Sequence, residues 1–318
     1  MQQAAQTAVI VGMLLLLAGC APGTATNPFA RATPHERYLQ SLEEAGLADT
    51  ALARDWAAAA AGALNDPEAA KVPLTNEVRH VPAEPRAYGY RLELQRGRVL
   101  RVALDVAASE PAAEPTRIFI DLFEIGEAGQ PPRHLESAEP DAHALEYEIE
   151  RDATYILRIQ PELLRGGMLT IGQRTVAALT FPVSGRTAAA VRSVFRDPRD
   201  NNTREHHGID IFAPRNTPVL AAADGVVSRV GTNDLGGNVV WVWDAHRRQS
   251  YYYAHLERQA VTAGARVRAG DVVGYVGNTG NARTTPPHLH FGIYQRGEGP
   301  IDPLPFVHGA RGPEVTAN

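Results

Sequence analysis

The stretch His206-His207-Gly208-Ile209-Asp210, together with His288-Leu289-His290 further along, carries the residues around which this chain is organised. His206 and Asp210 are four residues apart, a spacing that one face of a helix would allow. However, Gly208 and the β-branched, proline-containing run 209–219 argue against a helix. On a straight strand the two side chains would lie ~13 Å apart, which is too far for a shared ion. We therefore expect the chain to bend near Gly208, where the missing Cβ permits it.

The second motif has the two-residue period of a strand. His288 and His290 would face the same side, about 6.6 Å apart along the strand, so that one can hold a metal while the other stands beside it. Two imidazoles and a carboxylate, with one position left for water, are typical of catalytic rather than structural zinc. Taken alone, however, His-x-His is more often incidental than a metal site. The surrounding sequence has to decide between these alternatives.

Further blocks accompany the two motifs: Phe212-Ala213-Pro214, Thr217-Pro218-Val219, Ala223-Asp224-Gly225, Tyr253-Ala254-His255-Leu256, Ala269-Gly270-Asp271-Val272-Val273-Gly274 and Gly277-Asn278-Thr279-Gly280. In this order and spacing they strongly resemble the lysostaphin/LytM-like zinc metallopeptidases, which cut peptidoglycan cross-links. The resemblance covers about residues 193 to 305 and implies an antiparallel β-sheet domain with zinc at the floor of a groove.

The resemblance also implies roles for five residues. The family pattern His-x-Gly-x-Asp makes His206 and Asp210 ligands of Zn²⁺, and the second histidine of His-x-His makes His290 the third. The family's two other active-site histidines match His255 and His288, which we expect to be catalytic. Zinc acidifies bound water and polarises the scissile carbonyl, while an imidazole takes the proton or stabilises the oxyanion. Another divalent ion stays an alternative.

Two positions depart from the family pattern. Many relatives enter the first motif through Ser-x-Phe-Gly, whereas this chain has Ser193-Val194-Phe195-Arg196, and Asn216 stands where glycine commonly precedes Thr-Pro. For Asn216 we favour a turn residue in the left-handed conformation, which asparagine tolerates almost as glycine does. Neither departure is a ligand, so they bear on substrate preference more than on zinc.

Residues 1–19 have the features of a lipoprotein signal peptide. Ala8 to Leu17 form an apolar core of about ten residues, too short to span a bilayer but typical of a secretory signal. The following Leu17-Ala18-Gly19-Cys20 resembles the bacterial lipobox and implies lipidation of Cys20, the single cysteine of the chain. Residues 1–7 lack the usual Lys or Arg, and a signal cut elsewhere, leaving a spare thiol, is the alternative.

A lipidated Cys20 would anchor the chain in a membrane of the cell envelope. Ala21, rather than Asp, would then be the second residue, which by resemblance to Gram-negative lipoproteins favours the periplasmic face of the outer membrane. Residues 20–32 would be the lipidated cysteine and a tether rich in Pro, Gly, Thr and Ala. The formal net charge is -5, so the chain lacks the excess of Lys and Arg that is typical of nucleic-acid binding. We therefore expect no nucleic-acid partner.

Residues 33–75 predict a pair of short helices. Thr33-Pro34-His35-Glu36 is a capping box with proline at the first helical position, and this helix should end near Gly46. The second follows Asp49 and carries Trp56. The pair either docks an envelope protein or packs on the neighbouring domain, and we favour packing.

Residues 76–183 alternate with period two and predict about seven antiparallel strands in a β-sandwich. No catalytic constellation lies in it, so the sandwich would position the enzyme, bind glycan or bind an envelope partner. We interpret His134 and His143 as solvated, with adventitious cation binding as the alternative. We expect a linker at residues 184–192, the metallopeptidase domain at residues 193–306 and a tail at residues 307–318. The whole chain is thus predicted to have a mainly β fold.

Two classes of function remain. One is a zinc-dependent endopeptidase of peptidoglycan cross-links; the other is a non-catalytic or autoinhibited envelope regulator that activates a separate cell-wall amidase. All five expected site residues are present, whereas a degenerate domain would be expected to have lost some, and this favours the enzyme. Tyr251 and Tyr253 should share the strand face of His255 and either contact substrate or pack in the core.

Overall fold

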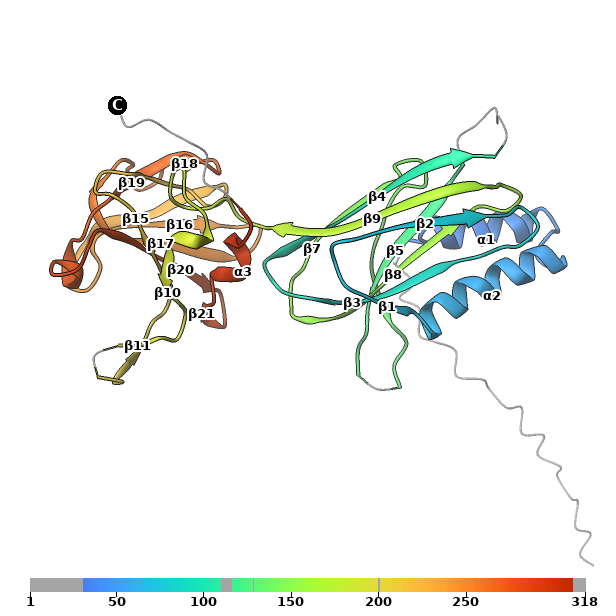
Figure 1. The fold of residues 1–318 in the computed structure, drawn as a ribbon, viewed down its shortest axis with the longest axis horizontal. Coiled ribbons are helices and arrows are strands. Elements are labelled where there is room, and N and C mark those ends of the chain that lie inside the picture. The colour runs from blue at the N-terminus through green and yellow to red at the C-terminus, as the bar shows by residue number, and fades with distance from the viewer. Residues whose placement is uncertain (1–30, 110–115, 128, 200, 311–318) are drawn as a thin grey trace, which may run out of the picture.

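The computed structural model describes residues 31–109, 116–127, 129–199 and 201–310, which form two lobes joined end to end (Figure 1). The expected signal peptide and the lipid site Cys20 lie outside these ranges. Strands dominate both lobes, as expected from the sequence. Within the described ranges, no helix has the length and apolar character needed to cross a membrane.

The helical pair lies against the sandwich of the N-terminal lobe. Helix α1 spans Pro34–Glu44 and α2 spans Ala51–Asn65. The capping box is confirmed, because the Thr33 side chain accepts from the Glu36 amide and the Glu36 carboxylate accepts from the Thr33 amide. Trp56 is fully buried, and its indole donates to the carbonyl of Pro161 at 2.8 Å. The pair therefore packs on its neighbour.

Two sheets pack face to face in the sandwich. One has the order β1 (Glu68–Ala70), β3 (Tyr88–Leu94), β8 (Ala153–Pro161), β5 (Ile118–Glu124) and β6 (Arg133–Ser137). The other has the order β2 (Leu74–His80), β9 (Gly167–Ala177), β4 (Arg98–Ala108) and β7 (Ala144–Glu148). Side chains such as Leu92, Leu100 and Ile171 form their shared core. β1 and the start of β2 lie within residues 68–75, where the helical segment was expected to continue, so that boundary is wrong.

The chain passes between the lobes earlier than expected. The last sandwich strand ends at Ala177, and Leu179, Phe181 and Val183 are buried in the core of the C-terminal lobe. Alternation of apolar residues predicts a strand-like run but does not say which core receives it. The expected linker 184–192 is likewise part of this lobe, where it forms the short helix η1 (Ala188–Ala190) and the start of strand β10.

A ten-stranded sheet builds the C-terminal lobe. Its main path is β10 (Val191–Ser193), β13 (Ile209–Phe212), β20 (His288–Gln295), β17 (Gln249–Gln259), β16 (Gly237–Asp244), β15 (Gly225–Asn233) and β18 (Arg266–Val267). Off this path lie β14 (Pro218–Leu220), β19 (Val272–Val276) and β21 (Gly299–Ile301). A separate hairpin is formed by β11 (Pro198–Arg199) and β12 (Arg204–Glu205). The short helices of this lobe include η2 (Gly280–Ala282) and α3 (Leu304–Val307). Val307, which begins the expected tail, is buried in this core.

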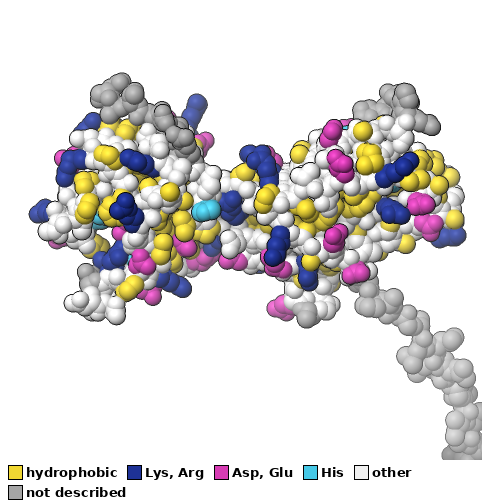
Figure 2. Space-filling model, viewed as in Figure 1, with side chains coloured by type: hydrophobic (Ala, Val, Ile, Leu, Met, Phe, Trp, Pro, Cys, Tyr) yellow, Lys and Arg dark blue, Asp and Glu magenta, His cyan; other side chains and the backbone are white. Residues whose placement is uncertain are grey.

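Charged pairs connect the two lobes, whose surfaces carry both signs of charge (Figure 2). Arg247 of the C-terminal lobe donates through two nitrogens to the two carboxylate oxygens of Glu148, each at 2.7 Å. Arg96 of the N-terminal lobe donates to Glu298 of the C-terminal lobe at 2.7 Å. Bidentate pairs constrain direction as well as distance, so these contacts define how the lobes meet.

Candidate metal centre

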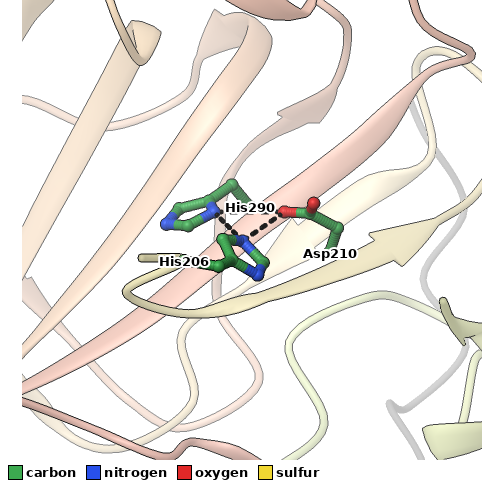
Figure 3. A group of neighbouring side chains, drawn as sticks. All are labelled: His206, Asp210 and His290. Carbon is green, nitrogen blue, oxygen red and sulfur yellow. Dashed lines mark hydrogen bonds and ion pairs between the residues drawn. The ribbon is translucent and has the colours of Figure 1, made fainter. Parts of the chain in front are cut away.

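Three side chains converge on one point of the C-terminal sheet (Figure 3). Nε2 of His206 lies 3.0 Å from Oδ1 of Asp210 and 2.9 Å from Nδ1 of His290. The third side of the triangle, from Nδ1 of His290 to Oδ1 of Asp210, measures 3.1 Å. These are the three residues expected to bind a metal. No other group of His, Cys, Asp and Glu side chains within the described part of the chain is arranged to hold an ion.

Local backbone geometry explains the convergence. Asp210 and His290 are paired residues of neighbouring strands β13 and β20, which places their side chains next to each other. His206 precedes β13, and the chain bends at Gly208 as predicted. A Cβ at position 208 would lie 2.5 Å from the carbonyl oxygen of Phe291 and 2.8 Å from the His290 ring. Glycine therefore allows the bend to lie directly against β20.

The ligand candidates are oriented by further hydrogen bonds. Nδ1 of His206 lies 2.8 Å from the carbonyl oxygen of Val194, so it carries the proton and leaves Nε2 for an ion. Arg199 donates to Oδ2 of Asp210 at 2.8 Å, which turns Oδ1 toward the imidazoles. Arg199 is not among the site residues that the sequence predicts, because an arginine in a polar stretch carries no motif that marks it as the partner of a ligand.

The donor set fits zinc. In a tetrahedral site with bonds of about 2.1 Å, ligand atoms lie about 3.4 Å apart, so the three observed separations are a few tenths of an ångström short. Burial alone would raise the pKa of Asp210, but its interactions with the neighbouring rings of His206 and His290 outweigh burial and hold that pKa well below its usual range. Asp210 is thus a carboxylate at neutral pH, as an ion requires.

His255 and His288 stand beside this triangle in the same cavity of about 470 Å³. Their ring centres are 5.0 Å apart. Nδ1 of His255 donates to the carbonyl of Thr279 and Nδ1 of His288 to that of Pro286, both at 2.9 Å, so each ring keeps Nε2 for the cavity. Burial, followed by the nearby His290 and His288, lowers the pKa of His255 to about 4. His255 is therefore a neutral imidazole that can accept a proton.

Tyr251 and Tyr253 pack in the core, as one of the two expected alternatives has it, but the prediction that they share the face of His255 is wrong. Tyr251 and Tyr253 are fully buried in the core, while Tyr252 and Ala254 line the cavity. His255 also faces the cavity because its φ of 59° is left-handed and breaks the alternation of β17. The register of β17 with β19 shifts just beyond it, between residues 256 and 258.

The other histidines of interest lie away from the triangle or are engaged elsewhere. His207 lines the cavity but is not part of the metal-binding group. His134 is hydrogen-bonded to Ser137, and His143 donates to a backbone carbonyl. Asn216 has a φ of 68°, which confirms it as a left-handed turn residue.

Known proteins resemble the part of the chain that carries this site. The family model described as Peptidase family M23 matches residues 204–303. An L-Ala–D-Glu endopeptidase of Bacillus subtilis is 37% identical over 138 residues, which cover 40% of this chain and 42% of the relative. The peptidoglycan DD-endopeptidase ShyC of Vibrio cholerae is 40% identical over 97 residues, 30% of this chain and 21% of the relative. The glycyl-glycine endopeptidase ALE-1 of Staphylococcus capitis is 37% identical over 120 residues, 36% and 32% of the two chains.

Solved structures give a match of the same extent. The structure of LytU is 34% identical, with a TM-score of 0.32, and the match covers 41% of this chain and 84% of LytU. This chain spans less than half the length of the curated relatives above. The matched stretch contains His206, Asp210 and His290 together with His255 and His288, which the motif order had singled out. Residues 204–303 therefore form a domain that matches peptidase family M23.

Proposed function

We propose that this chain is a zinc-dependent endopeptidase that hydrolyses peptide cross-links of peptidoglycan. One observation carries the proposal: His206, Asp210 and His290 present three mutually close ligand atoms inside a cavity that His255 and His288 share. The names of the curated relatives support a peptide substrate from the cell wall. They do not agree on the bond, since they name L-Ala–D-Glu, D,D and glycyl-glycine specificities.

The residues of the site have separable tasks. A bound Zn²⁺ supplies Lewis acidity at the scissile carbonyl and acidity to water. His206, Asp210 and His290 would hold it, and Arg199 and the Val194 carbonyl fix their orientation. His255, neutral and anchored through Nδ1, is placed to accept the proton of the attacking water. His288, held through Nδ1, is positioned to share in the proton transfer through Nε2 and, once protonated there, to donate a hydrogen bond to the developing oxyanion.

The proposal includes a lipid anchor on Cys20 at the periplasmic face of the outer membrane. It rests on the apolar run 8–17 and the lipobox-like residues 17–20. Labelling with a fatty acid analogue and membrane fractionation test it, with Cys20→Ala as the comparison. Equal labelling of both proteins would contradict lipidation of this residue.

Mass spectrometry of cross-linked muropeptide dimers tests the activity. The chain from Ala21 onward should convert dimers to monomers, and a zinc chelator or His290→Ala should stop the conversion. His246→Ala is the matched control, because His246 is exposed on a turn away from the cavity. A folded, zinc-loaded protein that converts no dimer would contradict the endopeptidase. Activation of an added amidase would then favour the regulator.

A further inference from the structure

Thr279 and His255 are hydrogen-bonded to each other twice. Nδ1 of His255 donates to the carbonyl oxygen of Thr279 at 2.9 Å, and the amide of Thr279 donates back to the carbonyl oxygen of His255 at 3.4 Å. His255 lines the cavity of the metal centre, whereas Thr279 is not among the described residues of the lining. Thr279 can therefore act on the reaction only through the residues that it holds.

The hydroxyl of Thr279 is held from two sides. It accepts from the amide of Asn238 at 2.9 Å and donates to the carbonyl oxygen of Leu256 at 2.9 Å. Leu256 follows His255 in β17, and Asn238 of β16 is its partner in the sheet. A hydroxyl that donates once and accepts once has a fixed orientation. The side chain of Thr279 thus sets where its own carbonyl lies relative to β17.

The turn between β15 and β16 packs on the same segment. The amide of His255 donates to the carbonyl oxygen of Gly236 in this turn at 2.7 Å. A Cβ on Gly237 would lie 2.1 Å from the hydroxyl oxygen of Thr279, and a Cβ on Gly280 would lie 2.3 Å from the amide nitrogen of Gly237. The two segments therefore meet backbone against backbone, and neither can shift without moving the other.

These contacts surround a strained residue. His255 has a φ of 59°, and a residue with a side chain keeps such a backbone only where its surroundings over-determine it. Its amide, its carbonyl and its Nδ1 are all engaged by the turn or by Thr279. The bond at Nδ1 also decides the tautomer, because the proton that it fixes there leaves Nε2 as the acceptor.

We propose that Thr279 is the positioning residue of His255: its hydroxyl holds its carbonyl against Nδ1 of His255, so that Nε2 stays unprotonated and directed at the cavity. The inference rests on the proposed function for the proton-accepting role of His255, but the tautomer of the ring can be measured without a substrate. Without the hydroxyl, the carbonyl and the ring can separate and the neutral ring exchanges tautomers. A reacting group misplaced by about 1 Å can cost about 100-fold in rate.

Thr279→Val tests the inference, because it replaces the hydroxyl by a methyl group of similar size. NMR of the full, zinc-loaded chain, labelled at its histidine nitrogens, should show His255 with its proton on Nδ1, and His255→Gln identifies its signals. In Thr279→Val we expect a mixture of both tautomers, and in Thr279→Ser the Nδ1 form again. A Thr279→Val chain in which His255 keeps the Nδ1 form overturns the inference, whatever its activity.

Kinetics with cross-linked muropeptide dimers give the second readout. Thr279→Val should lower kcat about 100-fold at unchanged KM and zinc content, and Thr279→Ser should restore most of it. Thr217→Val is the matched control, since Thr217 is also half-buried and donates to a backbone carbonyl, that of Pro214, at 2.7 Å. Loss of zinc together with activity in Thr279→Val would overturn the inference, because Thr279 would then support the whole site.

Two further outcomes remain decisive. If Thr279→Val does not fold, Thr279→Ala removes the same hydroxyl and is measured in its place, with the same expectations. If the unsubstituted chain cleaves no dimer, the endopeptidase is contradicted, and the tautomer of His255 in the variants still decides the role of Thr279.

Discussion

Each lobe contains a buried aspartate paired with an arginine, and the two pairs serve different ends. In the N-terminal lobe Arg158 donates through two nitrogens to Oδ2 of Asp121, while Ser137 donates to Oδ1 at 2.6 Å. In the C-terminal lobe Arg199 occupies only Oδ2 of Asp210, and Oδ1 faces two imidazoles. A carboxylate with both oxygens engaged by donors is structural, whereas one with an oxygen turned toward basic nitrogens is ready for an ion.

Removal of a metal ligand should have the largest effect of these changes: activity is lost, while the stability of the N-terminal lobe is kept. We expect His290→Ala to lower cleavage of peptidoglycan on the order of a thousandfold or more, because the activating ion is lost. Zinc content, measured by atomic absorption, should fall with it, while the N-terminal lobe keeps its stability. Retention of both zinc and activity would refute the assignment of His290 as a ligand.

The counterpart change in the other lobe is Asp121→Asn. It leaves Arg158 buried beside a neutral group, so the free energy of unfolding should fall by about 3 to 5 kcal/mol. Urea denaturation followed by tryptophan fluorescence measures this, since Trp56 lies in the same lobe. Asp105→Asn, on the exposed side of β4, is the control. A loss of zinc from Asp121→Asn would contradict the distinction between a structural aspartate in the N-terminal lobe and a metal-binding aspartate in the C-terminal lobe.

The stability of the N-terminal lobe should also depend on pH through His35. Burial and the charge of Arg158 lower its pKa to about 4 in the folded state, against 6.5 for an ordinary histidine. The unfolded chain therefore binds more protons between these values, and the free energy of unfolding falls by about 3 kcal/mol as pH drops from 6.5 to 4. In His35→Gln this part of the decline should be absent. Identical pH profiles of unfolding would contradict the assignment.

Arg199→Gln tests the orienting role in the C-terminal lobe and should have the smallest of these effects. Loss of such a partner typically weakens metal binding about 10- to 100-fold. Competition with a zinc-binding dye measures the affinity, and Arg199→Lys should restore part of it because one donor to Asp210 is regained. An unchanged zinc affinity would show that Asp210 needs no partner.

The sequence predicts the metal centre better than its surroundings. The bend at Gly208 and the two-residue spacing of His288 and His290 are local features, so the sequence indicates them directly. The choice of His206, Asp210 and His290 as the ligand set came from the resemblance to the family motifs. Arg199 lies in the β11–β12 hairpin and donates to Asp210 of β13, and no local pattern reveals such a contact between separate elements. The crossing into the second lobe at Ala177 was misplaced for the same reason, because apolar alternation is alike in both cores.

At His255 the left-handed backbone lowers the stability of the fold, while it brings the imidazole into the cavity. Function and stability therefore favour different residues at this position. A residue with a side chain costs of order 1 kcal/mol or more in this conformation, and glycine would adopt it without strain. His255→Gly should therefore relieve the backbone while it removes the imidazole from the cavity. At this position the inactive glycine variant should be more stable than the chain with histidine. We therefore expect a histidine to be retained there only where the reaction itself is needed.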